Sequence, residues 1–244
     1  MLIIMGRSRQ LLLLRQVLDE YQTVAVLPGI RGGQLVAPLS SQTLGLARAQ
    51  VNHGIREVIL CKDQAGKVGL RMQAINKGVF VVLVQANSPA ALAGLRFGDQ
   101  ILQINDTVVA GFTMTQVHDL IRKANPKRIV LHVRDRPFER TVTMHKDSID
   151  TIGFVFKNGK IISLVKDSSA ARNGLLTDHQ LLEHTRVNGQ NVVGIKDSEI
   201  TKIIREGGNV VTVTIMPSFI YDHMMKFMAT SIVKKLMDHS IPDL

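Results

Sequence analysis

The sequence predicts a mixed α+β protein made of two tandem copies of one small domain. Two observations carry this prediction: a short motif occurs twice, and each copy lies in the same succession of strand-like and helix-like segments. The motif is Lys67-Val68-Gly69-Leu70 in the first copy and Thr151-Ile152-Gly153-Phe154 in the second. In both copies a small-residue helical turn ending in Gly-Leu follows, at residues 88–95 and 168–175. With 244 residues, the chain can bury a separate core in each copy.

The first copy contains clear strand and helix signals. Strands are predicted at residues 57–61, 70–74, 79–84, 101–105 and 129–133. Ser88 and Pro89 begin a short helix that Gly94 ends, because a serine hydroxyl caps a helix and proline is tolerated in its first turn. A second helix, apolar on one face, runs from Thr113 or Thr115 to Ala124.

The same order recurs from Phe138, with a long helix over residues 196–205 and a closing strand over 210–215. Only residues 135–137 separate the copies, which is too short for free tumbling, so we expect a fixed tandem. The predicted parts are a flexible N-terminal region at residues 1–55, domains at 56–134 and 137–216, and a C-terminal helix and tail at 217–244. The second copy carries three extra residues, His184-Thr185-Arg186, which either bulge from a strand or lengthen its turn.

The two ends of the chain allow alternatives. The leucine-rich residues 11–18 either dock onto the body or bind a partner. Residues 219–237 are predicted to form one helix, either a membrane anchor or a helix packed against the body or a second subunit. Its balanced charges favour packing. No apolar run reaches the roughly 18 residues of a membrane span, and no clear secretory signal is seen, so we expect a protein that is not secreted.

Composition limits the class of function. The net charge is +10, and residues 56–134 hold 11 Lys and Arg against 5 Asp and Glu. This excess either favours acidic partners, such as anionic lipid, acidic peptide or nucleic acid, or reflects a well-solvated basic surface. With 4% aromatic residues and no Trp, an RNA binder that stacks bases on rings is disfavoured, and nucleic acid is not expected. The single cysteine, Cys61, excludes an internal disulfide framework and fits a reducing compartment.

The two Gly-centred motifs have the pattern of an anion-binding turn. A glycine between apolar residues lets the backbone curl so that successive amide groups face one point, where a peptide C-terminal carboxylate can bind. The strand that follows then offers an edge for an added strand. The alternative is that these are only tight hairpin turns.

No enzyme motif competes with this interpretation. The eight histidines show no His-Glu-x-x-His zinc pattern, Cys61 has no evident base, and no Gly-rich phosphate loop ends in Lys-Ser or Lys-Thr. A serine protease would need a further domain that carries its nucleophile, and the remaining residues at each end are too few for one. We therefore expect no enzymatic activity, no catalytic residue, no metal site and no cofactor.

Longer stretches carry a specific resemblance. They include Leu83-Val84-Gln85-Ala86-Asn87-Ser88-Pro89-Ala90, Gly94-Leu95-Arg96-Phe97-Gly98-Asp99, Arg134-Asp135-Arg136-Pro137-Phe138, Lys166-Asp167-Ser168-Ser169-Ala170-Ala171-Arg172-Asn173-Gly174-Leu175-Leu176 and Met237-Asp238-His239. From about residue 33 to residue 244, the chain resembles the syntenin family of tandem PDZ proteins. The resemblance implies two PDZ domains, each a small, partly open antiparallel β-barrel or sandwich with two helices.

The resemblance also implies a function. It is that of a scaffold or adaptor that binds C-terminal tails of membrane receptors such as syndecans, and phosphatidylinositol 4,5-bisphosphate, in membrane trafficking, exosome formation, adhesion and signalling. It implies a cytoplasmic protein, peripheral at plasma and endosomal membranes, with a nuclear pool allowed. One departure concerns the family's N-terminal Leu-Tyr-Pro-x-Leu motifs, which recruit an endosomal-sorting adaptor: here Tyr21 is followed by Gln22-Thr23, so the sequence does not predict that recruitment.

The resemblance assigns residues to three sites. The carboxylate would bind at Val68, Gly69 and Leu70, and at Ile152, Gly153 and Phe154. Ligand side chains would meet Met114, His118 and Ile121 in the first domain and Asp197, Thr201 and Ile204 in the second; for His118 an ordinary exposed helix residue is the alternative. Phosphoinositide would contact Lys67, Lys123, Lys127, Lys146, Lys160, Lys166 and Lys196, although any one of them could be a plain solvated lysine.

Neither copy has His at the helix position that faces the ligand's third-last residue, so apolar ligand residues are expected there. Two further hypotheses remain open. One is a peripheral protein that binds phosphoinositide first and peptide second. The other is self-association, as a homodimer or within one chain, with residues 241–244 entering a groove.

Overall fold

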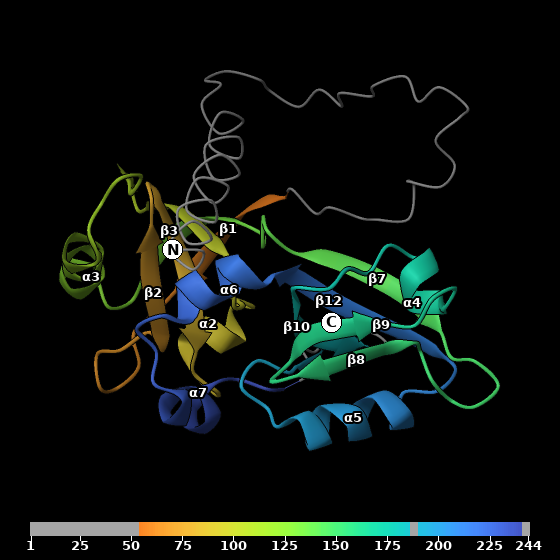
Figure 1. Cartoon of the computed structure of the whole chain (residues 1–244). Helices are drawn as coiled ribbons and strands as arrows, with labels where there is room; N and C mark the ends of the chain where they lie inside the picture. The colour runs from red at the N-terminus through yellow and green to blue at the C-terminus, as the bar shows by residue number, and fades with distance from the viewer. Residues whose placement is uncertain (1–53, 186–189, 241–244) are drawn as a thin grey trace. The chain divides into compact units, whose positions relative to one another are not determined.

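The computed structural model describes residues 54–185 and 190–240, with the backbone alone for residues 183–185 (Figure 1). The predicted flexible region at residues 1–55 and the last four residues therefore lie outside it, except for residues 54 and 55. None of the helices in the described ranges combines the length and apolar character needed to cross a membrane.

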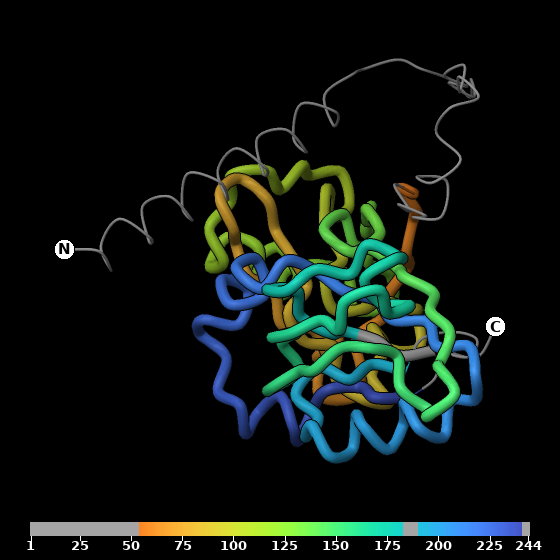
Figure 2. Tube along the Cα trace, turned by 45° about the vertical axis from the view of Figure 1, so that its right-hand side comes forward, coloured from red at the N-terminus to blue at the C-terminus, as the bar shows by residue number. Residues whose placement is uncertain are grey.

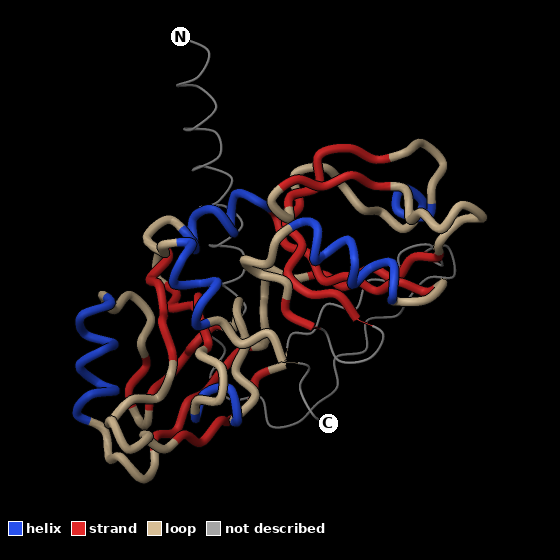
Figure 3. The backbone as a smooth tube through the Cα atoms, turned by 90° about the horizontal axis from the view of Figure 1, so that it is seen from below, coloured by secondary structure: helices blue, strands red, loops and turns tan. Residues whose placement is uncertain are grey.

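The first part of the described chain forms an antiparallel sheet. Its strands are β1 (Ile55–Leu60), β2 (Leu70–Ile75), β3 (Gly78–Val84), β4 (Gln100–Ile104), β5 (Thr107–Val108) and β6 (Ile129–Arg134). They pair in the order β1-β6-β4-β3-β2, and β5 pairs with β4. Figure 3 draws the strands of the chain in red and the helices in blue. Every residue of β3 is buried, as its continuous apolar run predicts. The strand β2 lies at one edge of the sheet.

The second part repeats this arrangement. Its strands are β7 (Arg140–His145), β8 (Phe154–Lys157), β9 (Lys160–Leu164), β10 (His179–Thr185), β11 (Gln190–Asn191) and β12 (Val210–Pro217). The order is β7-β12-β10-β9-β8, with β11 paired to β10, so β8 is the edge strand that corresponds to β2. The mixed α+β class and the two antiparallel sheets expected from the sequence are confirmed.

Each sheet has one short and one long helix. The helices are α2 (Pro89–Leu92) and α3 (Met114–Lys123) in the first part, and α4 (Ser169–Arg172) and α5 (Asp197–Glu206) in the second. Thr113 begins α3 with a capping box, in which its hydroxyl and the Gln116 side chain each bond the other's backbone amide. Lys196 begins α5 and provides no such bond. Val117 of α3 and Ile200 of α5 are buried in the respective cores.

The segment after β12 was predicted as one helix over residues 219–237, and this prediction is wrong. The chain forms α6 (Ser218–Met225) and α7 (Thr230–Leu236), which Figure 2 traces at the C-terminal end. The physical reason is that Met224 and Val233 are both buried, yet on one straight helix they would lie on opposite faces. The break between the two helices lets each residue bury its side chain, and it leaves Phe227 72% exposed.

The three-residue insertion lengthens a strand. His184 and Thr185 pair with Val213 and Thr212 of β12 as the end of β10, while Arg186 lies outside the described residues. The register of β10 shifts between Leu181 and Glu183, but β4 shifts at the matching place between Ile101 and Gln103. The irregularity therefore belongs to the repeat and not to the insertion.

Candidate peptide-binding grooves and an adjoining basic pocket

The first Gly-centred loop turns two amide groups outward. Gly69 has φ +79°, a left-handed conformation that favours glycine. The Val68 carbonyl accepts the Ala90 amide at 3.0 Å, and the Gly69 carbonyl accepts the Gln85 amide at 2.8 Å. In a trans peptide the carbonyl and the next amide point in opposite directions. The amides of Gly69 and Leu70 therefore point away from α2 and β3, toward the open side of β2.

The second loop has the same geometry. Gly153 has φ +83°. The Ile152 carbonyl accepts the Ala170 amide at 3.2 Å, and the Gly153 carbonyl accepts the Val165 amide at 2.8 Å. The amides of Gly153 and Phe154 accordingly face the open side of β8. Two consecutive outward-facing amides are the arrangement that can bind a carboxylate. A simple tight turn would not need the additional contact with α2 or α4.

A serine packs against each glycine and holds the loop in place. A Cβ on Gly69 would lie 2.1 Å from the Ser88 Cβ, and one on Gly153 would lie 2.1 Å from the Ser168 Cβ. Each serine also caps its short helix, α2 or α4. The small-residue turns that follow the motifs in the sequence therefore support the loops from behind.

In the first domain, α3 lies beside β2, and the three predicted pocket residues share this helix. Met114 is its first residue, and Met114, Ile121 and Leu70 are half-buried where they pack against the core. His118 is exposed. An apolar side chain entering between β2 and α3 would therefore meet Leu70 and Ile121.

In the second domain, Asp197 has a structural partner that the sequence did not reveal. Its two carboxylate oxygens accept the amides of Asn158 at 2.7 Å and Gly159 at 2.9 Å, which ties the start of α5 to the β8–β9 turn. Thr201 is half-buried, and its hydroxyl donates to the Asp197 carbonyl at 2.8 Å. Ile204 is buried in the core at 9% exposure, so it offers less surface to a ligand than Ile121 does.

The seven predicted lipid-contacting lysines differ in availability. Lys67, Lys123, Lys127, Lys166 and Lys196 are exposed, and Lys160 makes an ion pair with Asp178 at 2.7 Å. The Lys146 side chain is only 3% exposed; its ammonium group contacts Asp150 at 2.9 Å and donates to the Arg205 carbonyl at 2.8 Å. Its position makes it the least available of the seven.

Lys146 has a counterpart in the first domain. The Lys62 ammonium group donates to the Arg122 and Ala124 carbonyls at the end of α3, as Lys146 does at the end of α5. A lysine there satisfies the last carbonyls and the helix dipole. Both lysines thus stabilise the long helix beside a groove.

A pocket of about 740 Å³ adjoins the second groove, between the β8–β9 turn, the start of α5 and helices α6 and α7. Four lysines line it, and two of them, Lys157 and Lys234, were not among the predicted site residues. They join Lys160 and Lys196, against Asp197 and Asp222. Lys234 comes from a distant segment, so only the fold brings it to this place.

Among residues 54–185 and 190–240, no group of three or more His, Cys, Asp or Glu side chains could hold a metal ion. The tail proposed for self-association, residues 241–244, lies outside the described residues.

The chain is similar to proteins of known family. A family profile described as PDZ domain matches residues 80–135. Human Syntenin-1 is 59% identical over 209 residues, which covers 86% of this chain and 69% of that protein. Mouse Syntenin-2 is 54% identical over 230 residues, which covers 94% of this chain and 77% of that protein. The solved structure of INAD PDZ3 in complex with a TRP channel tail is 23% identical with a TM-score of 0.30, covering 32% of this chain and 84% of that chain.

Proposed function

The chain belongs to the syntenin family of tandem PDZ proteins, and from this premise we propose a non-enzymatic scaffold that binds C-terminal peptides of membrane receptors. The observation that carries the proposal is the outward direction of two consecutive amides in each loop, next to an edge strand. Such a loop binds a terminal carboxylate, and the edge adds the peptide as a further strand.

The peptide would enter each groove antiparallel to β2 or β8. Its carboxylate would bind the amides of Gly69 and Leu70, or of Gly153 and Phe154, and its last side chain would lie against the apolar residues of the helix. The half-buried Met114 supports an apolar ligand residue at the third-last position in the first groove. Because the chain belongs to the syntenin family, we propose the C-terminal tails of syndecans as its partner class.

Binding of anionic phosphoinositide is the second part of the proposal. The 740 Å³ pocket supports it, because Lys157, Lys160, Lys196 and Lys234 converge there. Each lysine near an anionic membrane contributes about 1 kcal/mol, so the four together would give useful recruitment even with Lys160 paired. The two exposed acids Asp178 and Asp222 oppose this attraction in part.

Engagement of both grooves and a bilayer would combine weak sites through effective concentration. We place this scaffold on the cytoplasmic side of plasma and endosomal membranes, where it would act in trafficking, adhesion and signalling.

The first test is an NMR titration with a syndecan-type peptide that ends in a free carboxylate, beside the same peptide amidated at its C-terminus. The amides of Gly69 and Gly153 report the two grooves separately. We expect both to shift with the free acid and neither with the amide. Equal binding of both peptides would mean that charge, not carboxylate capture, drives association.

A salt titration separates the scaffold from a protein that binds lipid first. Binding to vesicles containing phosphatidylinositol 4,5-bisphosphate should weaken steeply as ionic strength rises, while peptide binding in the grooves should change little. Lys234→Gln should lower vesicle binding without changing the peptide titration. Unchanged vesicle binding in Lys234→Gln would remove the pocket from the lipid site.

A further inference from the structure

The C-terminal segment of residues 236–238, where α7 ends, pairs with the chain just after β3 through one antiparallel bridge. The Ala86 amide donates to the Leu236 carbonyl at 3.1 Å, and the Asp238 amide donates to the Val84 carbonyl at 2.8 Å. Gln85 and Met237 lie opposite each other in an antiparallel bridge. Met237 is 3% exposed, so the segment is fixed by burial as well as by hydrogen bonds.

The first carboxylate-binding loop lies on the other side of the same three residues. Backbone groups alternate in direction along an extended strand. Val84 and Ala86 accordingly face the C-terminal segment, while Gln85 donates its amide to Gly69 on the opposite side. The segment and the loop thus share one strand end, and a shift of residues 84–86 would shift the Gly69 carbonyl with them.

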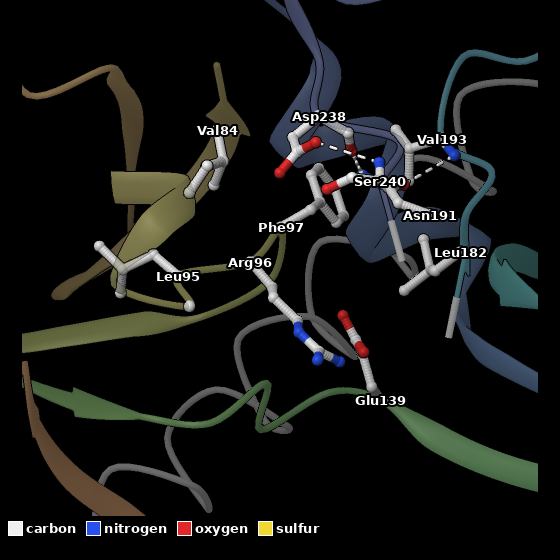
Figure 4. Close-up of a pocket in the computed structure, with 12 residues that line it drawn as sticks. Val84, Leu95, Arg96, Phe97, Glu139, Leu182, Asn191, Val193, Asp238 and Ser240 are labelled. Carbon is white, nitrogen blue, oxygen red and sulfur yellow. Dashed lines mark hydrogen bonds between the residues drawn. The ribbon is translucent and has the colours of Figure 1, made fainter. Parts of the chain in front are cut away.

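The C-terminal segment is in turn held by the second domain. The Asp238 carbonyl accepts a hydrogen bond from the Asn191 side-chain amide at 2.8 Å, as Figure 4 shows. The Asn191 side-chain oxygen accepts a hydrogen bond from the Val193 amide at 2.9 Å. The Asn191 backbone carbonyl contacts the His239 ring nitrogen Nδ1 at 2.8 Å. Asp238 therefore connects Val84 of β3 to Asn191 of β11 through its own backbone.

In the described part of the second domain, no matching support is present. The residues that correspond to 84–86 are Leu164, Val165 and Lys166. The Val165 amide donates to the Gly153 carbonyl, as the Gln85 amide donates to the Gly69 carbonyl. Within residues 54–185 and 190–240, however, no backbone bond reaches the Leu164 carbonyl or the Lys166 amide from the side opposite the loop. The second groove is thus an internal control for the first.

We propose that residues 236–239 act as a brace that positions the first carboxylate-binding loop, so that peptide affinity in the first groove depends on the backbone bonds of Asp238. Asp238 is a positioning residue that does not touch the peptide. The inference rests on the proposed function. A net hydrogen bond is worth about 0.5–1.5 kcal/mol, which corresponds to a roughly 2- to 13-fold change in affinity.

The test compares Asp238→Pro with Asp238→Ala in the full chain. Proline lacks the amide that bonds Val84, whereas alanine keeps it. Both variants lose the carboxylate that accepts the Ser240 amide, so the pair differs chiefly in the backbone bond. Met237 has φ −60° and ψ 136°, a conformation that a following proline accepts.

Peptide binding is measured by NMR with the free-acid peptide, using Gly69 for the first groove and Gly153 for the second. We expect Asp238→Pro to weaken the first groove by about 2- to 13-fold, with the second groove within twofold and Asp238→Ala like the parent at both. Unchanged first-groove affinity in a folded Asp238→Pro chain, or an equal loss at both grooves, would overturn the brace.

A second variant protects the test against misfolding. Asn191→Asp keeps an oxygen for the Val193 amide but replaces the donor to Asp238 with an acceptor, and it should weaken the first groove in the same way. Amide hydrogen exchange at Gln85 gives a readout that needs no peptide: it should be faster in both variants than in Asp238→Ala, and equal rates would contradict the brace. If the parent chain binds no peptide at either glycine, the proposed function fails, while the exchange measurement still decides the brace.

Discussion

Asp99 and His179 occupy the same position in the two domains, four residues after Leu95 and Leu175, and each lies near an arginine of the first strand. In the first domain Arg56 donates to the Asp99 carboxylate at 3.2 Å. In the second, Arg140 lies close enough to His179 to act on its charge. The repeat has thus placed a buried acid in one domain and a half-buried base in the other.

The pKa values of these two side chains are shifted in opposite directions. Burial raises the pKa of Asp99 to about 6, against the opposing effects of the Arg96 amide and the Arg56 charge. Burial, followed by the charge of Arg140, lowers the pKa of His179. Acid should therefore favour the folded first domain and disfavour the folded second domain.

The first prediction concerns Asp99→Asn. Because the pKa is higher in the folded chain than in the unfolded chain, the folded state binds more protons between about pH 4 and pH 6. Stability from this group is present below pH 4 and is lost as pH rises through 6, by about 3 kcal/mol. Urea unfolding followed at first-domain amides should show this slope in the parent and a flatter one in Asp99→Asn. The exposed Asp106→Asn is the control, and an identical slope in all three chains would contradict the prediction.

The second prediction concerns His179→Gln. The folded-state pKa of His179 is lowered, so the unfolded chain binds more protons as pH falls below about 6.5, and the second domain should lose stability there. The glutamine variant cannot titrate and should remove this loss. Amide exchange in β12, measured between pH 7 and pH 5, tests it: the parent should lose protection as pH falls and His179→Gln should not, and an equal loss in both chains would contradict the prediction.

The third prediction compares two glycines with positive φ. In Gly69→Ala the new Cβ would lie 2.1 Å from Ser88, whereas in Gly66→Ala, at φ +72°, nothing lies within 4 Å. Gly66→Ala should lose only the conformational cost, about 1 kcal/mol. Gly69→Ala should lose about 2 kcal/mol or more, together with peptide binding in the first groove. Equal unfolding free energies for the two variants would show that contact with Ser88 does not hold the loop.

Much of this fold follows from the sequence, for reasons that particular residues make plain. The Gly-centred motifs, Ser88 and the apolar run of β3 act over a few residues each, so their local structure was predictable. The break between α6 and α7 was not, because it depends on where Met224 and Val233 find a core. Site residues divide in the same way: Lys196 follows from its place at the start of a helix, whereas Lys234 reaches the pocket only through the tertiary fold.

The fourth prediction concerns Asp197→Ala. This change removes the partner of the Asn158 and Gly159 amides, and Gly159 is buried, so the unfolding free energy should fall by about 1–3 kcal/mol. Asp222→Ala, which also lines the pocket but is exposed, should have little effect. Chemical denaturation measures both. A neutral result for Asp197→Ala would leave its carboxylate available to a ligand.

The fifth prediction separates two effects of one lysine. Lys196 is the N-cap of α5 and makes no capping bond, so Lys196→Ser should stabilise the chain by about 1 kcal/mol. The same change removes one of the pocket lysines and should weaken binding to vesicles containing phosphatidylinositol 4,5-bisphosphate. Thermal unfolding and vesicle sedimentation check the two effects. A loss of stability would show that Lys196 has a structural role.

The position of α3 and α5 beside the edge strands has a consequence for solubility. An open strand edge is a template on which identical chains stack without limit, as in a fibril. In the proposed binding mode an added peptide would lie between the edge strand and the long helix, so its far side would face a helix and not another open edge. Growth of the sheet at β2 or β8 should then stop after a single guest, so the architecture that admits a ligand also protects these two edges from polymerising.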